Sequence, residues 1–226
     1  MQAVLDESLN TGAAFVESKL GNQRFADYMY KFGLGTTTGI DLPNEVAGLV
    51  TNLKSSRDIE YATASFGQGI AISPITITRA LSVLANGGTL VTPHLAERID
   101  YKTGFSSEIT YPQGARVISQ ETSHEISRML TEVVDTSLLG GTVKMEHYSI
   151  AAKTGTAQIA APTGGYYSDK YLHSFFGYFP SYDPKFLVFL YTVEPQGEPY
   201  ASHTLTAPFM NIAKYLINSY EVPPDR

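Results

Sequence analysis

The sequence predicts an α+β fold in which helices cover an antiparallel sheet. Three short apolar segments, at residues 149–158, 173–179 and 186–193, follow one another with short connections, and consecutive strands joined in this way most often pair antiparallel. An amphipathic segment at 204–219 comes after them and can cover one face of the sheet. With 226 residues and a hydrophobic content of 43%, the chain can bury a sizeable core. We therefore expect one domain, or most of one.

Charge and composition argue against several classes of function. The formal net charge is −6 and no long basic run occurs, which disfavours binding to nucleic acid. The absence of cysteine excludes disulfides, thiol catalysis and thiolate metal sites. The five histidines lack metal-ligand spacing, so we expect neither a metal nor a cofactor. No signal peptide or bilayer-spanning run is recognisable, and we expect a soluble chain without an anchor.

The first candidate site residues are Ser8 and Asn10, which stand just before a segment of small residues that predicts a helix. A hydroxyl and a carboxamide two positions apart could both point into a cleft. Serine and asparagine are also preferred helix N-caps, and this interpretation is at least as good on the tripeptide alone.

Three further helices are predicted at residues 22–32, 74–85 and 120–139. Ser73 and Ser119 are expected N-caps of the second and third helices, and glycines follow all three. The apolar residues at helical spacing, which should face the core, are Phe25, Tyr28, Met29 and Phe32, then Ile77, Ala80, Leu81 and Leu84, then Ile126, Met129, Leu130, Val133 and Val134. These helices are expected to be scaffold.

The glycine-rich segment at 33–39 does not predict a nucleotide site. Thr38 stands where the third glycine of G-x-G-x-x-G is required, and no P-loop motif occurs anywhere. Proline and glycine mark residues 40–48 as a loop, and residues 91–117 as short strands and loops.

The strongest functional signal is Lys153-Thr154-Gly155-Thr156, which follows an apolar run in the first predicted strand. We expect an edge strand whose apolar part packs on the core, with Lys153 and both threonine hydroxyls facing a cleft. One cation and two donors suit an acyl substrate with a carboxylate. Glycine lets a ligand or another backbone approach closely. Alone, the motif fits a solvated strand ending in a turn equally well.

The end of the chain completes the sheet. The segment at 186–193 is continuously apolar, as expected of a strand buried on both faces. The final helix at 204–219 places Leu205, Phe209, Ile212 and Leu216 on one side. Tyrosines at 166, 167 and 171 form either a packed or rim cluster, which we favour, or a wall for an extended substrate.

Several motifs follow one another along the whole chain. They are Ser8-Leu9-Asn10, Phe32-Gly33-Leu34-Gly35, Thr38-Gly39-Ile40-Asp41-Leu42-Pro43 with Glu45, Phe66-Gly67-Gln68-Gly69 with Ser73-Pro74, Ala85-Asn86-Gly87-Gly88, Lys153-Thr154-Gly155-Thr156-Ala157-Gln158, His173-Ser174-Phe175-Phe176-Gly177-Tyr178-Phe179-Pro180 and Val222-Pro223-Pro224-Asp225. In this order they resemble the transpeptidase domain of class B penicillin-binding proteins of the division type. The resemblance implies a β-lactamase/transpeptidase-like fold, of which residues 1–226 form the incomplete C-terminal portion.

The resemblance also implies an activity and a site. The activity is that of a serine D,D-transpeptidase, which cross-links peptidoglycan stem peptides through an acyl-enzyme and binds β-lactams. The implied catalytic residues are Ser8, Asn10 and Lys153, and the implied substrate-binding residues are Thr154, Gly155, Thr156 and Gln158. The threonines would bind the terminal carboxylate, and the N–H of Thr156 would donate to the oxyanion. The parent protein would act at the extracytoplasmic face of the bacterial plasma membrane.

The sequence departs from the family at the nucleophile, because no serine stands three residues before a lysine. We expect S-x-x-K in an upstream segment, so this chain alone should be inactive. Its partners would be the upstream half of the domain or a partner chain, and division proteins. Exposed apolar surface should then cause aggregation or association. A minor departure is Ala152, where many relatives have glycine, which should narrow the approach only slightly.

Two other functions remain open at the level of sequence. The chain could be a noncatalytic module that binds stem-peptide carboxylates or a division partner. The retained cation of Lys153 favours catalysis over this alternative. A β-lactamase of the same fold is a weaker alternative, because the match outside the motifs indicates the biosynthetic branch.

Overall fold

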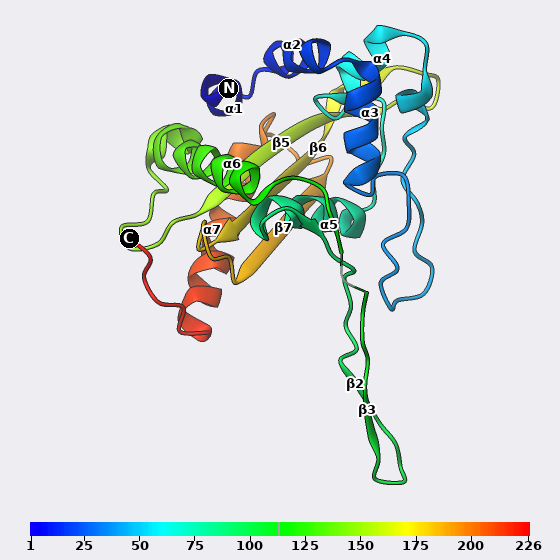
Figure 1. Ribbon diagram of the computed structural model, residues 1–226. Helices are drawn as coiled ribbons and strands as arrows, with labels where there is room; N and C mark the ends of the chain where they lie inside the picture. The colour runs from blue at the N-terminus through cyan, green and yellow to red at the C-terminus, as the bar shows by residue number, and fades with distance from the viewer. Residues whose placement is uncertain (113) are drawn as a thin grey trace.

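A three-stranded antiparallel sheet forms the centre of the computed structural model, which describes residues 1–112 and 114–226 (Figure 1). The strands are β5 (Ala151–Ala160), β6 (Tyr166–Phe179) and β7 (Phe186–Val193), in the order β5-β6-β7. Helices lie on both faces of this sheet (Figure 1). The α+β fold expected from the sequence is confirmed, and β5 is an edge strand as expected.

Two expectations about the strands are corrected. Strand β6 begins at Tyr166, seven residues before the predicted start, so all three tyrosines of the cluster belong to the strand. Strand β7 has the predicted bounds but is not buried on both faces, since Tyr191 and Val193 are about half exposed. The reason is its position: among the described residues, β7 pairs only with β6 and its other edge is open.

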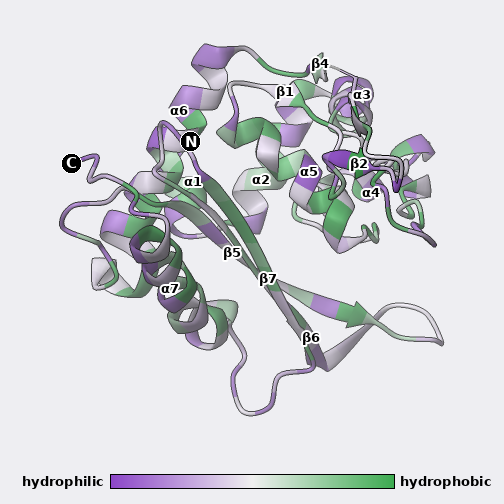
Figure 2. Cartoon of the chain, turned by 90° about the horizontal axis from the view of Figure 1, so that it is seen from below, coloured by the Kyte–Doolittle hydropathy of each residue, from purple (hydrophilic) through white to green (hydrophobic). Residues whose placement is uncertain are grey.

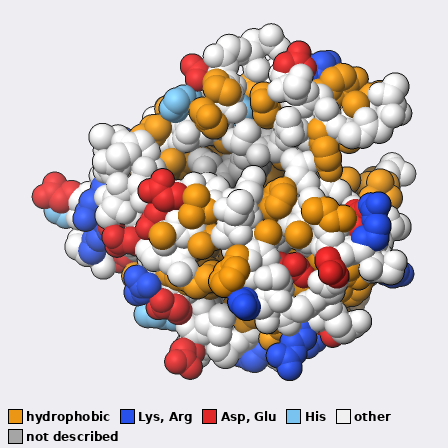
Figure 3. All heavy atoms as spheres, turned by 90° about the horizontal axis from the view of Figure 1, so that it is seen from above, with side chains coloured by type: hydrophobic (Ala, Val, Ile, Leu, Met, Phe, Trp, Pro, Cys, Tyr) orange, Lys and Arg blue, Asp and Glu red, His pale blue; other side chains and the backbone are white. Residues whose placement is uncertain are grey.

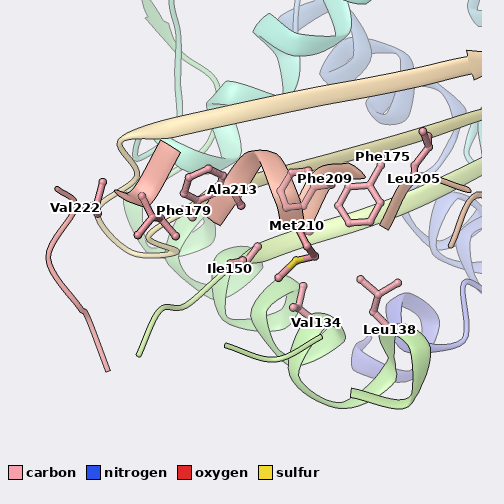
Figure 4. Packing of buried hydrophobic residues seen from close by; sticks show 12 residues of the cluster. Val134, Leu138, Ile150, Phe175, Phe179, Leu205, Phe209, Met210, Ala213 and Val222 are labelled. Atoms are coloured by element: carbon pink, nitrogen blue, oxygen red, sulfur yellow. The ribbon is translucent and has the colours of Figure 1, made fainter. Parts of the chain in front are cut away.

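Helix α7 (Ala201–Ser219) packs along one face of the sheet and encloses the main apolar core (Figure 4). It begins three residues before the predicted start. Phe209 stacks on Phe175 at 4.4 Å between ring centroids and meets Phe179 edge-on at 6.2 Å. Stacked and edge-to-face pairs at these distances are the favourable arrangements for aromatic rings.

Ala152 belongs to this core and does not border the cleft that the sequence analysis expected beside it. Its side chain is fully buried and lies opposite Gly177 of β6. A Cβ atom added at Gly177 would lie 2.8 Å from that of Ala152 and 2.5 Å from the ring of Phe209. The methyl group of Ala152 therefore fills space over a glycine and leaves the approach to β5 unchanged.

The opposite face of the sheet is covered by α5 (Pro74–Ala85) and α6 (Gln120–Glu132). Ser73 and Ser119 cap these helices as predicted, each accepting a hydrogen bond from the backbone N–H three residues later. On α5 the buried face is rotated from the predicted one, and its members are Thr76, Arg79, Ala80 and Val83. The face is rotated because α5 directs Arg79 toward the loop at residues 33–39, so the arginine takes a buried position in place of the larger apolar residues.

Helix α6 ends earlier than its apolar pattern predicts. It continues as a π-helical turn, η2 (Val133–Ser137), and then as a 3-10 turn, η3 (Leu138–Gly141). Leu139 has a left-handed backbone, with φ of 49°, which is uncommon for a residue other than glycine. π-Helical turns are frequent at functional sites, and this one borders the cleft described below.

The N-terminal helices form a second layer with its own apolar cluster. The N-terminal helices are α1 (Gln2–Asp6), α2 (Asn10–Leu20), α3 (Asn22–Lys31) and α4 (Asp58–Ala64), with the 3-10 turn η1 (Thr51–Lys54). Residues of α3, η1 and α4 contribute to the cluster, whereas Leu5 of α1 packs against a different cluster, which contains Leu130 of α6. On α3, Ala26 is buried and Phe25, Met29 and Phe32 pack against the cluster. Tyr28, predicted to face the core, is 41% exposed, because the buried stripe is narrower than the apolar pattern.

Two small antiparallel pairs complete the fold. Strand β1 (Thr89–Leu90) pairs with β4 (Ala115–Arg116), and β2 (Arg98–Asp100) with β3 (Ser106–Glu108). The β2–β3 hairpin projects from the body (Figure 1), and Figure 2 shows the sheet and α7 from below. Short strands and loops were expected here. Among the described residues no helix has the length and apolar character needed to cross a membrane.

The glycine-rich segment is a structural loop held by Arg79. Its Nη2 donates to the Gly33 carbonyl oxygen at 3.0 Å, and its Nη1 donates to that of Thr38 at 3.3 Å. Glu45 accepts hydrogen bonds from the backbone N–H groups of Thr38 and Gly39. Gly33 has φ of 80°, and a Cβ atom there would lie 2.2 Å from the guanidinium. The loop thus accommodates an arginine of the protein itself.

Replacing Arg79 with methionine is expected to destabilise the protein. Met has a similar apolar stem but leaves buried carbonyl groups of the loop without donors, which costs about 1–3 kcal/mol of unfolding free energy. Urea denaturation followed by circular dichroism measures this loss, with the exposed Arg98→Met as the control. Equal stability of both variants would show that the loop does not depend on the guanidinium.

Candidate functional site

A cleft of about 530 Å³ runs along the open edge of β5. Its walls come from five places: strand β5, Tyr171 of strand β6, the junction of α1 and α2, the η2–η3 turns, and the first turn of α7 with the residues before it. The sequence places Ser8, Asn10, Lys153, Thr154 and Thr156 in this cleft, and the structure brings these five together.

Lys153 and Ser8 form the central contact of the cleft. The Nζ of Lys153 donates to Ser8 Oγ at 2.9 Å and to its neighbouring Thr154 carbonyl oxygen at 3.1 Å. The two residues are 145 positions apart in the sequence. This contact joins the N-terminal helices to the sheet across the cleft.

The alternative interpretation of Ser8 and Asn10 as N-caps is wrong. The N-cap of α2 is Leu9, and no side chain caps the helix. Ser8 has φ of 51° in the tight turn between α1 and α2, where the Leu9 N–H donates to the Val4 carbonyl. This left-handed turn leaves the Ser8 hydroxyl free of the backbone and directed at the lysine.

The lysine is partly buried in the cleft, and this burial lowers its pKa. Among the described residues, no carboxylate lies within salt-bridge distance of it. Its partners are a hydroxyl and a carbonyl. A lysine of this kind can exchange a proton with a neighbouring hydroxyl more readily than an ordinary surface lysine.

The Lys153 amine should therefore titrate below the ordinary pKa of lysine. NMR of protein labelled with ¹³C at the lysine side chains measures this directly. The variant Ser8→Ala should keep the lowered pKa, because burial and not the hydroxyl causes it. A return of the pKa to the ordinary lysine value in Ser8→Ala would contradict this cause.

The two threonines reach the cleft from the other face of β5. Side chains alternate along a strand, so Lys153 lies on the α6 face while Thr154 and Thr156 lie on the α7 face. The expectation that all three side chains face one cleft agrees with the structure, although they reach it from opposite faces of the strand. They line one cleft because β5 is the edge strand and the cleft passes around it.

Thr156 is linked to the beginning of α7. The Ala201 N–H donates to Thr156 Oγ1 at 3.0 Å. The hydroxyl accepts this bond, and its own hydrogen remains available to donate. The positive end of the helix dipole lies beside it, so this corner of the cleft favours a negatively charged group.

Hydrogen bonds indicate which backbone groups of β5 face the open edge. The Thr154 carbonyl accepts from Lys153 Nζ, whereas the Gly155 carbonyl accepts from Ser174 Oγ of the neighbouring β6 at 3.4 Å. In an antiparallel strand the N–H and C=O of one residue point to the same edge of the strand, and the next residue points its pair to the opposite edge. Residues two apart thus direct their backbone groups to the same edge. The N–H groups of Thr154 and Thr156 therefore point into the cleft.

Gly155 and Gln158 do not belong to the lining of the cleft. A Cβ atom at Gly155 would lie 2.6 Å from Ser174 Oγ, so the close approach seen at this glycine comes from a side chain of β6. Gln158 is exposed farther along β5.

The cleft also contains residues that sequence reasoning missed. Tyr171, Pro199 and Tyr200 line the α7 side, and Asp6 and Glu7 line the α1 side. Only Tyr171 carried a signal, as part of the tyrosine cluster. Tyr166 belongs elsewhere, since its hydroxyl accepts a hydrogen bond from the Gly69 N–H at 2.7 Å. The lining residues of the η2–η3 turns are Val133, Ser137, Leu138 and Leu139, and their unusual backbone has no signature in apolar spacing.

Comparison with known proteins gives the same assignment along almost the whole chain. The family model described as "Penicillin binding protein transpeptidase domain" matches residues 1–214. The chain is 35% identical over 224 residues to "Stage V sporulation protein D" of Bacillus subtilis, with 98% of this chain and 34% of that protein covered. It is 33% identical to "Penicillin-binding protein PbpB" of Mycolicibacterium smegmatis, with 97% and 35% covered. The chain thus spans about a third of the length of these relatives.

Solved structures agree with the fold. The crystal structure of penicillin-binding protein 3 from Mycobacterium tuberculosis is similar to the whole chain with a TM-score of 0.90 and 31% identity, and the match covers 53% of that chain. Structures of the same protein complexed with aztreonam and with ampicillin match equally well, each with a TM-score of 0.90.

Proposed function

The chain belongs to the penicillin-binding protein transpeptidase family, and we propose from this premise that it forms the C-terminal part of a serine D,D-transpeptidase site. The observation that carries the proposal is the contact between Lys153 Nζ and Ser8 Oγ in a cleft that Thr156 also lines. It unites the lysine of K-T-G-T with the serine of S-x-N, as the chemistry of this family requires. The substrates would be peptidoglycan stem peptides, met at the extracytoplasmic face of the plasma membrane.

Two of the three motifs are present in the chain, and we assign the third to a segment outside the printed sequence. No serine stands three residues before a lysine in the 226 residues. The open edge of β7 and the exposed Leu9 and Phe15 near the start of the chain offer places for such a segment to pack. Figure 3 shows hydrophobic side chains distributed over the face that carries α1 and α2. Residues 1–226 would then be the C-terminal portion of one domain.

The reaction divides into two transfers of an acyl group. The serine oxygen of S-x-x-K attacks the carbonyl before the terminal D-alanine, the peptide bond breaks, and D-alanine leaves with the proton that the serine gave up. An amine of a second stem then attacks the ester and releases the serine. Lys153 and Ser8 relay these protons, and Asn10 holds the substrate amide.

The other residues of the cleft stabilise charge. The Thr156 N–H donates to the oxygen of the tetrahedral intermediate, a contact worth about 3 kcal/mol in other enzymes. The hydroxyls of Thr154 and Thr156 bind the terminal carboxylate of the stem, at the corner next to the N-terminus of α7. A β-lactam would bind in the same cleft, and the mycobacterial relative has been solved in complexes with aztreonam and with ampicillin.

The variant Thr156→Val tests this assignment in the full-length protein that contains the chain. Valine keeps the shape and the backbone N–H but removes the hydroxyl. We expect acylation by benzylpenicillin to slow by about 10-fold, because one charge-assisted hydrogen bond to the carboxylate is lost. Competition with a fluorescent penicillin measures this rate. Thr192→Val, on β7 away from the cleft, is the matched control. Equal rates in both variants would remove Thr156 from the carboxylate site.

A further inference from the structure

A row of polar residues crosses the sheet on the face covered by α7. Thr156, His173 and Thr192 are paired neighbours on β5, β6 and β7, so their side chains share one face. His173 is fully buried at the centre of the row. The reaction described above does not use it, and the sequence alone treats it as one of five scattered histidines.

Two hydrogen bonds connect the first turn of α7 to this row. His173 Nδ1 and Thr204 Oγ1 share a hydrogen bond of 2.9 Å, and the Ala201 N–H donates to Thr156 Oγ1 at 3.0 Å. Thr204 Oγ1 also lies 3.3 Å from the Ala201 carbonyl oxygen, to which it donates. Ala201 and Thr204 belong to one helical turn, so the two bonds fix the start of α7 above both strands.

The imidazole is suited to a fixed structural contact. Burial lowers its pKa, and the backbone of Pro199 acts in the opposite direction with a smaller effect, so the ring is neutral at physiological pH. Among the described residues, its Nε2 has no partner at full hydrogen-bond geometry. The nearby Glu198 and His203 pair with each other on the exposed side of α7. The bond to Thr204 is therefore the principal polar contact of the ring.

We propose that His173 is a positioning residue for Thr156. By holding Thr204 it fixes the start of α7, keeps the Ala201 N–H on Thr156 Oγ1, and thereby leaves the Thr156 hydroxyl hydrogen free to donate into the cleft. The oxygen accepts from the Ala201 N–H, so the single hydroxyl hydrogen is not needed for this contact and can donate into the cleft. The inference rests on the proposed function for the identity of the ligand, a terminal carboxylate, but not for the positioning itself.

Amide hydrogen exchange of the ligand-free, full-length protein that contains this chain, measured by NMR, tests the positioning. His173→Asn keeps a polar atom near the place of Nδ1, whereas His173→Leu removes the bond. We expect the Ala201 N–H to exchange about fivefold faster in His173→Leu, the effect of one neutral hydrogen bond, with partial recovery in His173→Asn. The amides of the β5–β6 pair should not change. If the buried substitution prevents folding, Thr204→Val removes the same bond from α7. Unchanged exchange of Ala201 in these variants would overturn the proposal.

Ligand binding separates this inference from the proposed function. The probes are N-acetyl-D-Ala-D-Ala and its C-terminal amide, titrated into the full-length protein that contains this chain. We expect the unchanged protein to prefer the carboxylate and His173→Leu to lose about fivefold of that preference. No preference in the unchanged protein would contradict the proposed function, and amide exchange would still decide the positioning. A preference retained in full by His173→Leu would overturn the positioning role.

Discussion

Replacing Lys153 with methionine is expected to lower the rate of acylation by benzylpenicillin by about 10²–10⁴-fold, the range for loss of a positioned proton-transfer group. Methionine retains an apolar stem of similar length but cannot donate to Ser8 Oγ or carry charge. The Thr154 carbonyl would lose its donor as well. The effect is large because burial has prepared the amine for proton exchange with the hydroxyl.

The measurement uses the full-length protein that contains this chain, and it follows the acyl-enzyme by stopped-flow or quenched mass spectrometry. Lys214→Met, on the exposed side of α7, is the matched control and should keep the original rate. The acylation rate of Ser8→Ala should lie between those of the two lysine variants, because Lys153 keeps its lowered pKa but loses its hydroxyl partner. Acylation at the original rate in Lys153→Met would exclude the lysine from the chemistry.

Replacing Phe209 with alanine is expected to reduce the free energy of unfolding by about 3–5 kcal/mol, the cost of removing a buried phenylalanine. Phe209 is fully buried and lies between Phe175 and Phe179 at the centre of the core (Figure 4). Its ring also covers Gly177, where no side chain can fill the space that the ring leaves. The site can collapse only if β6 and α7 move toward each other.

Urea denaturation followed by circular dichroism measures the effect. The control is Phe105→Ala, a phenylalanine that is 75% exposed near the end of the β2–β3 hairpin, where the change should stay within about 0.5 kcal/mol. Equal losses in the two variants would mean that the core is not organised around Phe209.

Local chemistry explains the parts of the fold that the sequence predicted well. Ser73 and Ser119 satisfy the first N–H groups of α5 and α6, so these helix starts depend on residues next to them. The bounds of β7 follow in the same way from a continuous apolar run. Its exposure does not, because burial depends on whether another strand lies alongside, and local sequence carries no information on that.

The same distinction applies to the site. The residue types of Lys153 and Thr156 predicted a cation and a hydroxyl that could bind a carboxylate substrate, and the structure places both side chains in one cleft. Alternation along β5 places their side chains on two faces of the strand. They line one cleft because β5 is the edge strand, which local sequence could not give. The roles of His173 and Ala201 depend on where α7 docks. Contacts of this kind arise from tertiary packing and leave no pattern in the sequence.

The most direct test of the account is the intact mass of this chain after incubation with excess benzylpenicillin, alone and together with a segment that carries S-x-x-K, as proposed to lie upstream. The account predicts no covalent adduct on this chain in either case, and an adduct on the added segment that is lost when Lys153 is replaced. An adduct on this chain alone, with Ser8 as the first residue to examine, would show that the nucleophile lies within residues 1–226 and would contradict the division of the site proposed here.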